Sequence, residues 1–218
     1  MNVLAIETAT PMCSVALQAG NEVFERSELS PRGHASLLLP WISELLAAAG
    51  LRYVDLDRIV VGRGPGGFTS LRIGLSVAQG IALAHDLPVV PVSSLVALAE
   101  AADPEKTHDR ILALIDARMG EVFLGAYRRE AEGLALMAAE AVTPPEQIRL
   151  PEPGKWLVAG SGLAAYPDLI AELLIQSSAQ FRPDAWPLAS KLLTLGQTMQ
   201  TVKAWEVEPI YVRDNVTS

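Results

Sequence analysis

The fold is decided by residues 60–74, which read Val60-Val-Gly-Arg-Gly-Pro-Gly-Gly-Phe-Thr-Ser-Leu-Arg-Ile-Gly74. Five glycines fall within thirteen residues of this stretch, between an apolar strand and a helical pattern. Glycine allows sharp turns and close backbone approach. A helix that begins there directs its unpaired N–H groups and positive dipole end at the turn. The stretch is therefore predicted to be either an anion cradle or a surface of close packing.

Two known nucleotide-binding loops do not match this stretch. The spacing Gly62-x-Gly64-x-x-Gly67 resembles a dinucleotide-binding loop, but the following strand, 88–93, has no acidic residue near its end. Phe68-Thr69 follows Gly67 where a P-loop needs Lys-Ser/Thr. Without that lysine, phosphoryl transfer by the P-loop route is disfavoured.

The composition indicates a packed protein that is a poor nucleic-acid binder by itself. Half of the 218 residues are hydrophobic, and the formal net charge is -8. Binding to phosphates relies on Lys and Arg, so a partner is expected to supply the positive surface unless a basic stripe assembles in three dimensions. The single cysteine, Cys13, fits a reducing compartment. With no basic N-terminal region and no long apolar run, we expect a cytoplasmic protein without a signal peptide or membrane span.

The order of predicted elements occurs twice along the chain. The first half is predicted to contain strands 2–9, 13–19 and 22–29, helix 34–49, strand 58–62, helix 68–85, strand 88–93 and helix 94–102. After a polar joint at 103–109, the second half is predicted to contain strands 111–116, 121–128 and 134–141, helix 145–150, strand 156–159, helix 166–176, strand 179–182 and helix 187–200.

Each half therefore reads βββαβαβα, which predicts a mixed five-stranded sheet with helices on its faces. We predict an α/β chain with two such lobes, 1–104 and 105–218. Two halves of this kind resemble the duplicated actin-like, RNase H-like fold.

The duplication places one carboxylate at the same point of each half. Glu7 ends the first strand of the first half and Asp116 ends that of the second. In open α/β sheets this end of the strand lines the crevice. The two carboxylates could face each other across a cleft and help hold a metal–nucleotide, or each could simply end its strand in water. The candidate nucleotide-binding residues are Glu7, Thr8, Gly64, Gly66, Gly67, Thr69 and Asp116.

Catalytic and metal-binding constellations are not visible in the sequence. His34, His85 and His108 share no metal-ligand spacing, and the serines have no local base partner. Helix 68–85 instead carries small residues four apart, Gly74 and Ala78, which allow close helix packing. This face and the apolar face of helix 34–49 serve either the internal core or a partner.

These features together resemble the TsaB (YeaZ) family over nearly the whole chain. The resemblance rests on the following segments: Leu4-Ala-Ile-Glu-Thr-Ala-Thr10, Arg32-Gly-His34 with Leu38-Leu39-Pro40, Gly62 to Gly74, Pro91-Val-Ser-Ser-Leu95, Asp116-Ala-Arg-Met-Gly-Glu-Val122 and Pro209-Ile-Tyr-Val-Arg213. Three positions depart from the family pattern. The family usually has Asp where Glu7 stands, often has Ser-Phe-Thr-Gly where residues 67–70 read Gly-Phe-Thr-Ser, and often has Tyr where Phe123 stands.

The resemblance implies a subunit that is not an enzyme by itself. It implies binding to TsaD, together with TsaE, in a complex that forms threonylcarbamoyladenosine next to the anticodon of tRNAs reading codons that start with A. It also implies a homodimer when TsaD is absent, contact with tRNA only through the complex, and no cofactor beyond an ATP or ADP at the complex interface. The expected partner interface comprises His34, Leu38, Trp41, Leu71, Gly74 and Ala78.

The alternative is an active ATPase or small-molecule kinase of the actin-like fold. Glu7, Asp116 and the turns at 64–67 and 160–162 would then hold a magnesium nucleotide. Against it, Ala117-Arg118-Met119 follows Asp116 where a glycine-rich turn would be expected. A peptidase is a weaker third option, because neither a metal pair nor a triad is visible.

Overall fold

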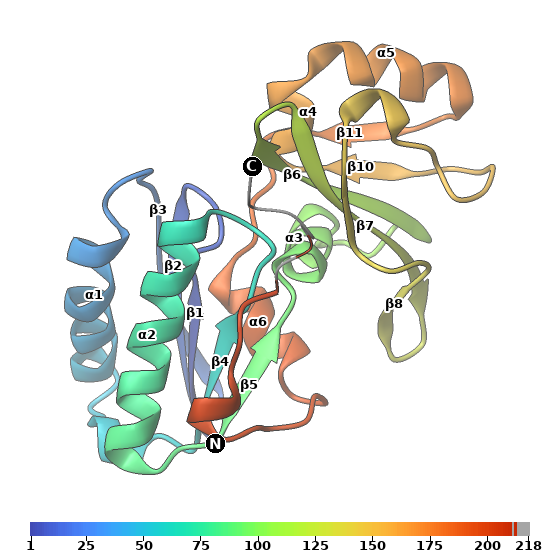
Figure 1. Ribbon diagram of the computed structural model, residues 1–218. Coiled ribbons are helices and arrows are strands. Elements are labelled where there is room, and N and C mark those ends of the chain that lie inside the picture. The colour runs from blue at the N-terminus through green and yellow to red at the C-terminus, as the bar shows by residue number, and fades with distance from the viewer. Residues whose placement is uncertain (211, 213–218) are drawn as a thin grey trace. The chain divides into compact units, whose positions relative to one another are not determined.

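The structure, a computed structural model, describes residues 1–210 and 212. They divide into two compact units (Figure 1), the first formed by Met1–Ala97 with Pro187–Ile210 and the second centred on Leu98–Trp186. Tyr211 and Arg213 of the closing motif lie outside the described residues. The order of strands and helices confirms the duplicated α/β fold.

The first unit is built on a mixed five-stranded sheet in the order β3-β2-β1-β4-β5. The first three strands form an antiparallel meander, and β4 and β5 join β1 in parallel. The bounds are β1 Asn2–Glu7, β2 Met12–Ala19, β3 Glu22–Leu29, α1 His34–Ala48, β4 Arg58–Gly62, α2 Phe68–His85 and β5 Val89–Val92, with a 3-10 turn at Tyr53–Asp55. Helix α3, Ser94–Ala102, begins in this unit and continues past Ala97, where the unit's first segment ends.

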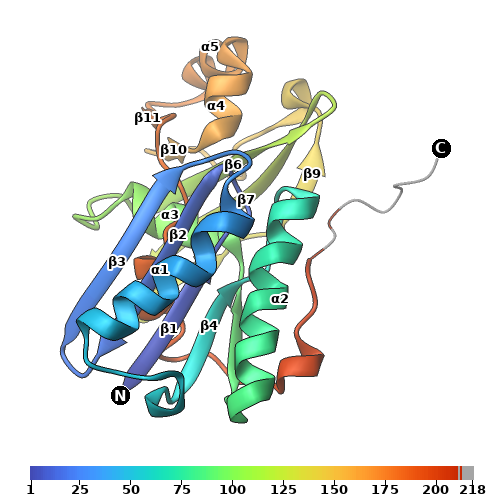
Figure 2. The same ribbon diagram turned by 90° about the vertical axis from the view of Figure 1, so that its left-hand side faces the viewer.

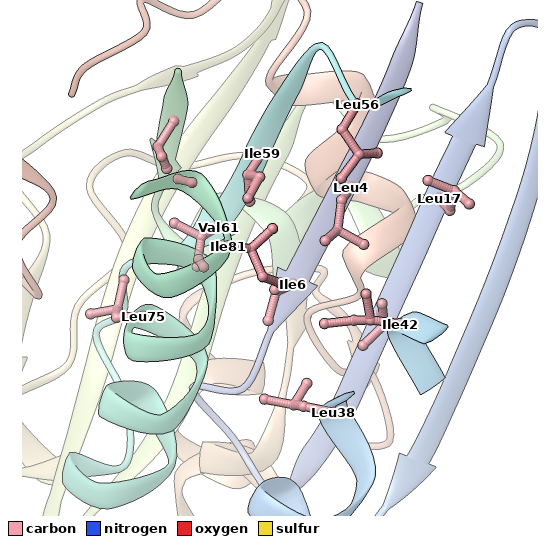
Figure 3. Packing of buried hydrophobic residues seen from close by; sticks show 14 of the residues in the cluster. Leu4, Ile6, Leu17, Leu38, Ile42, Leu56, Ile59, Val61, Leu75 and Ile81 are labelled. Carbon is pink, nitrogen blue, oxygen red and sulfur yellow. The ribbon is translucent and has the colours of Figure 1, made fainter. Parts of the chain in front are cut away.

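Helices α1 and α2 lie side by side over one face of this sheet (Figure 2). The strands alternate between its two faces. Leu4 and Ile6 of β1 pack under α1 and α2 (Figure 3), whereas Val3 and Ala5 belong to the core on the opposite face. A strand buried on both faces reads as a continuous apolar run, which is why β1 shows no alternation in the sequence.

The second unit repeats this sheet in the order β11-β10-β6-β7-β8, and β9 adds a sixth strand against β7. Again a meander is followed by parallel strands. The bounds are β6 Arg110–Arg118, β7 Glu121–Glu130, β8 Gly133–Leu136, β9 Ala141–Thr143, β10 Leu157–Ala159, α4 Ser161–Ala165, α5 Pro167–Gln176 and β11 Gln180–Arg182.

Three expectations need correction here. The predicted strand 134–141 is two short strands, β8 and β9, and the predicted helix 145–150 is a single 3-10 turn, Pro145–Gln147. Two adjacent prolines explain the short turn, because proline removes a backbone donor and restricts the residue before it. The sheet therefore has six strands rather than five.

The third correction concerns the boundary expected at 104/105. Residues 187–210 return to the first unit, where α6 (Ala189–Leu195) covers the face of the sheet opposite α1 and α2. Its Ala189, Leu192 and Leu193 fill the apolar core on that face. The chain then runs along α2, where the Gln79 side-chain amide donates to the carbonyls of Ala204 and Val207, at 3.1 Å each.

Gly74 is required for the close approach of α2 to the sheet. A Cβ at this position would collide with the Thr8 side chain, whereas one at Gly80, on the exposed face, would meet nothing within 4 Å. Gly74 and Ala78 of α2 are therefore buried inside the first unit, with Gly74 against Thr8, directly after β1.

This placement predicts opposite effects of two alanine substitutions in one helix. Gly80→Ala should stabilise the protein by about 0.5–1 kcal/mol, because alanine forms helix better than glycine. Gly74→Ala should instead destabilise it by about 1–3 kcal/mol through overpacking against Thr8. Urea unfolding of both variants checks this, and equal stabilisation would contradict the packing.

Candidate functional site

The topology gathers the candidate residues of the first unit at the carboxyl end of its parallel strands. Here the loop between β1 and β2, residues 8–11, uses three successive carbonyl groups to hold three other segments. The bonds run from Gly67 N to Ala9 O (2.7 Å), from His34 Nε2 to Thr10 O (3.0 Å) and from Ser30 N to Pro11 O (2.8 Å). We call this segment the clasp loop.

Glu7 lies directly before the clasp loop and is completely buried. Its carboxylate accepts hydrogen bonds from the Ala9 amide at 2.7 Å and from the Ser94 hydroxyl at 2.8 Å. Burial raises the pKa of Glu7 from 4.5 to about 7, and these hydrogen bonds limit the rise. A side chain at Gly62 would collide with the carboxylate. The predicted strand-end carboxylate is thus enclosed by the protein's own groups.

The glycine stretch packs against the same loop. Gly64 is buried with a φ of +91°, a conformation that favours glycine. A Cβ at Gly66 would collide with Ala9, and the Gly67 amide is already donated to the Ala9 carbonyl. Of the candidate nucleotide-binding residues in this unit, only Gly67 and Thr69 are exposed. The arrangement is one of close packing, with the Gly67 amide directed inward.

Asp116 occupies the corresponding position in the second unit, at the end of β6. It is half-buried, and its carboxylate accepts from the Arg118 amide at 2.9 Å and pairs with the Arg118 guanidinium at 3.1 Å. The Asp116 amide donates to the Ser161 hydroxyl at 3.1 Å. Both Glu7 and Asp116 therefore lie where the duplication predicts, but Glu7 is enclosed and Asp116 is paired with a cation.

The residues expected at a partner interface are mostly internal. His34, Leu38, Leu71, Gly74 and Ala78 are buried in the first unit. Trp41 is half-buried against the same core. This corrects the expected face: the apolar periodicity of α1 and α2 marks the surface that packs on their own sheet.

The three histidines serve separate structural contacts. His34 bonds to the clasp loop, His85 stacks on Tyr53 with ring centroids 5.8 Å apart, and His108 Nδ1 lies 3.1 Å from Asp103 Oδ1. Within residues 1–210 and 212, no three His, Cys, Asp or Glu side chains are grouped so as to hold a metal ion. In the same residues, no helix is both long and apolar enough to cross a bilayer.

Sequence reasoning missed the distant serines that bond to the two strand-end acidic residues. Ser94 lies in the quoted segment 91–95, but its bond to Glu7 joins residues 87 positions apart. The Ser161 hydroxyl accepts from the backbone amide of Asp116, 45 positions away. Each of these two serines is the first residue of a helix that follows a strand. Such a serine indicates helix capping as readily as a contact with a distant residue.

The burial of Glu7 predicts a specific pH dependence of stability. Because its pKa is raised in the folded state, its contribution to stability is fully present below about pH 4.5 and is lost as the pH rises through about 7. The difference amounts to about 3 kcal/mol. Glu7→Gln keeps the shape without the charge, so it should remove this loss. Urea unfolding of the wild type and the variant at pH 5 and pH 8 tests this prediction. If the free energy of unfolding changes by the same amount in both proteins, Glu7 is not a buried titrating carboxyl.

Comparison with known proteins gives a consistent relationship over the whole chain. The family model described as "TsaD: tRNA N6-adenosine threonylcarbamoyltransferase" matches residues 23–217. The Escherichia coli protein named "tRNA threonylcarbamoyladenosine biosynthesis protein TsaB" is 39% identical, with 99% of this chain and 96% of that protein covered. A protein of the same name from Haemophilus influenzae is 36% identical, with 100% and 95% covered.

Solved structures agree with these relatives. A Pseudomonas aeruginosa crystal structure, titled as an uncharacterized protein with similarity to peptidase YEAZ, superposes with a TM-score of 0.89 at 38% identity, covering 97% of this chain and 99% of that one. A second, titled "YeaZ from Pseudomonas aeruginosa", gives a TM-score of 0.86 at 36% identity, covering 96% and 99%. The sequence resemblance is confirmed, and the chain belongs to the TsaB (YeaZ) family.

Proposed function

We propose that this chain is a non-catalytic subunit of the machinery that forms threonylcarbamoyladenosine in tRNA. It acts by binding TsaD, together with TsaE, in the cytoplasm. The names of its full-length relatives support a role in this biosynthesis. The subunit contributes a surface and leaves the transfer chemistry to its partner.

The observation that carries this proposal is the enclosed carboxyl end of the first sheet. An actin-like ATPase would need its strand-end carboxylate and glycine turn open to a magnesium nucleotide. Glu7 is instead covered by Gly62 and bonded to Ser94, and the Gly67 amide is bonded to Ala9. Any ATP or ADP in the complex would therefore sit at an interface between subunits, with the exposed Gly67 and Thr69 as the nearest groups of the glycine stretch.

The partner surface is the outer side of α1 and α2. Leu37, Trp41, Ile73 and Val77 pack on the first-unit core yet stay partly exposed. A half-exposed tryptophan among aliphatic side chains has the composition of an interface centre. The same surface would form an isologous homodimer when TsaD is absent, so the homodimer and the heterodimer would compete.

Val77→Arg should separate binding from folding. The arginine places a charge in the middle of this surface, so the variant should still show a cooperative melting transition but fail to co-elute with TsaD. Leu174→Arg, on an exposed leucine of α5 in the second unit, is the matched control and should co-elute normally.

The consequence for tRNA modification is measured in the same preparation. In a reaction reconstituted from TsaD, TsaE and the enzyme that makes threonylcarbamoyl-adenylate, both Val77→Arg and omission of this chain should reduce modification at least tenfold. Unchanged modification on omission would sink the proposal, as would magnesium-dependent ATP turnover by the isolated chain.

A further inference from the structure

Charge is distributed unevenly between the two ends of the first sheet. The carboxyl-end segments, 8–11, 30–37 and 63–72, contain Arg32, Arg63 and Arg72 but no Asp or Glu, and the nearest carboxylates are the buried Glu7 on β1 and Glu28 on β3. The opposite end carries Glu22, Asp55, Asp57 and Asp86. Of its two arginines, Arg52 is paired with Asp55 at 3.2 Å and Arg58 donates to the Gly196 carbonyl at 3.5 Å. In a chain with a net charge of -8, these three loop segments thus form a local basic edge.

The clasp loop joins the parts of this basic edge. Its neighbouring carbonyls hold Ser30 and His34, on either side of Arg32, and Gly67, next to Phe68. The segments that carry the arginines are therefore bonded to one four-residue loop.

Both backbone groups of Arg63 are hydrogen-bonded, but one nitrogen of its side chain is not. Its amide donates to the Val92 carbonyl and its carbonyl accepts from the Ile210 amide, at 2.8 Å each. Its Nε is buried and has no hydrogen-bond partner among the described residues. A buried N–H of a cation without an acceptor is unfavourable, so the side chain gains a hydrogen bond if it turns outward to an oxyanion.

The first turn of α2 adds an aromatic group to the edge. The Arg72 guanidinium lies 3.2 Å from the centroid of the Phe68 ring, and Phe68 remains 63% exposed. Arginine beside an exposed aromatic ring is typical of surfaces that follow a nucleic-acid backbone and stack on unpaired bases. This combination favours RNA over an acidic protein segment as the ligand.

We propose that the basic edge formed by Arg32, Arg63, Phe68 and Arg72 contacts the phosphodiester backbone of the tRNA substrate. The inference rests on the proposed function and goes beyond it, because it gives this chain a direct contact with RNA. On binding, the Arg63 side chain turns outward so that its unpaired Nε donates to a phosphate oxygen, and the exposed Arg32 adds a second electrostatic contact. The rest of the acidic surface repels the RNA and so limits contact to this edge.

The test measures binding of a fluorescent tRNA transcript to the assembled complex with TsaD and TsaE over a range of salt concentrations. Arg63→Glu should weaken binding roughly tenfold at about 0.1 M salt, and the slope of log K against log salt should fall by about one. Lys155→Glu, which makes the same charge change at an exposed lysine of the second unit, should alter neither. Melting and co-elution with TsaD are recorded for each variant.

Each outcome decides the proposal. If Arg63→Glu binds tRNA more weakly but still co-elutes with TsaD, the proposal is supported. If its tRNA affinity and salt slope equal those of Lys155→Glu, the proposal is overturned. Loss of TsaD co-elution also overturns it, because Arg63 would then pair with a carboxylate of the partner protein. If Arg63→Glu does not fold, Arg32→Glu at an exposed loop position decides by the same readouts. Failure of the proposed function is seen separately, as unchanged modification when the chain is omitted.

Discussion

The first unit depends on how its clasp loop satisfies buried polar groups. Four residues between β1 and β2 hold the glycine stretch, the start of α1 and the end of β3 through consecutive carbonyls. Glu7, just before them, ties the Ala9 amide to the Ser94 hydroxyl at the start of α3. Buried backbone groups must find partners, so these bonds fix the loop conformations together. The carboxyl end of the sheet is consequently a closed structural joint.

The same constraint explains why glycine is needed where the sequence has it. Gly62 leaves room for the Glu7 carboxylate, Gly66 for Ala9 and Gly74 for Thr8. In related architectures, glycines at a strand–helix turn let the backbone approach a phosphate. Here they let it approach the protein's own first strand and clasp loop. The helix face that could have met a partner is thereby used internally, which leaves the outer side of α1 and α2 for recognition.

Much of the fold could be predicted from the sequence, because local signals were strong. Helices 68–85 and 94–102 were predicted with their exact ends, and the repeated order of elements gave the duplicated sheet. The prediction was weakest where distant segments decide the outcome. Periodicity showed that Gly74 and Ala78 share a face but not that Thr8 covers it. The duplication located Glu7, whereas its burial depends on Gly62 and Ser94, which the fold brings from 55 and 87 residues away.

The central claim is that the glycine stretch is closed by the protein's own clasp loop. The most direct measurement is an amide NMR spectrum of the isolated chain, with the signals of Gly64, Gly66 and Gly67 followed as magnesium ATP is added. Because the Gly67 amide is donated to Ala9, these signals should stay unchanged at millimolar nucleotide. Saturable shifts at these glycines with one nucleotide per chain would show an open cradle and contradict the account.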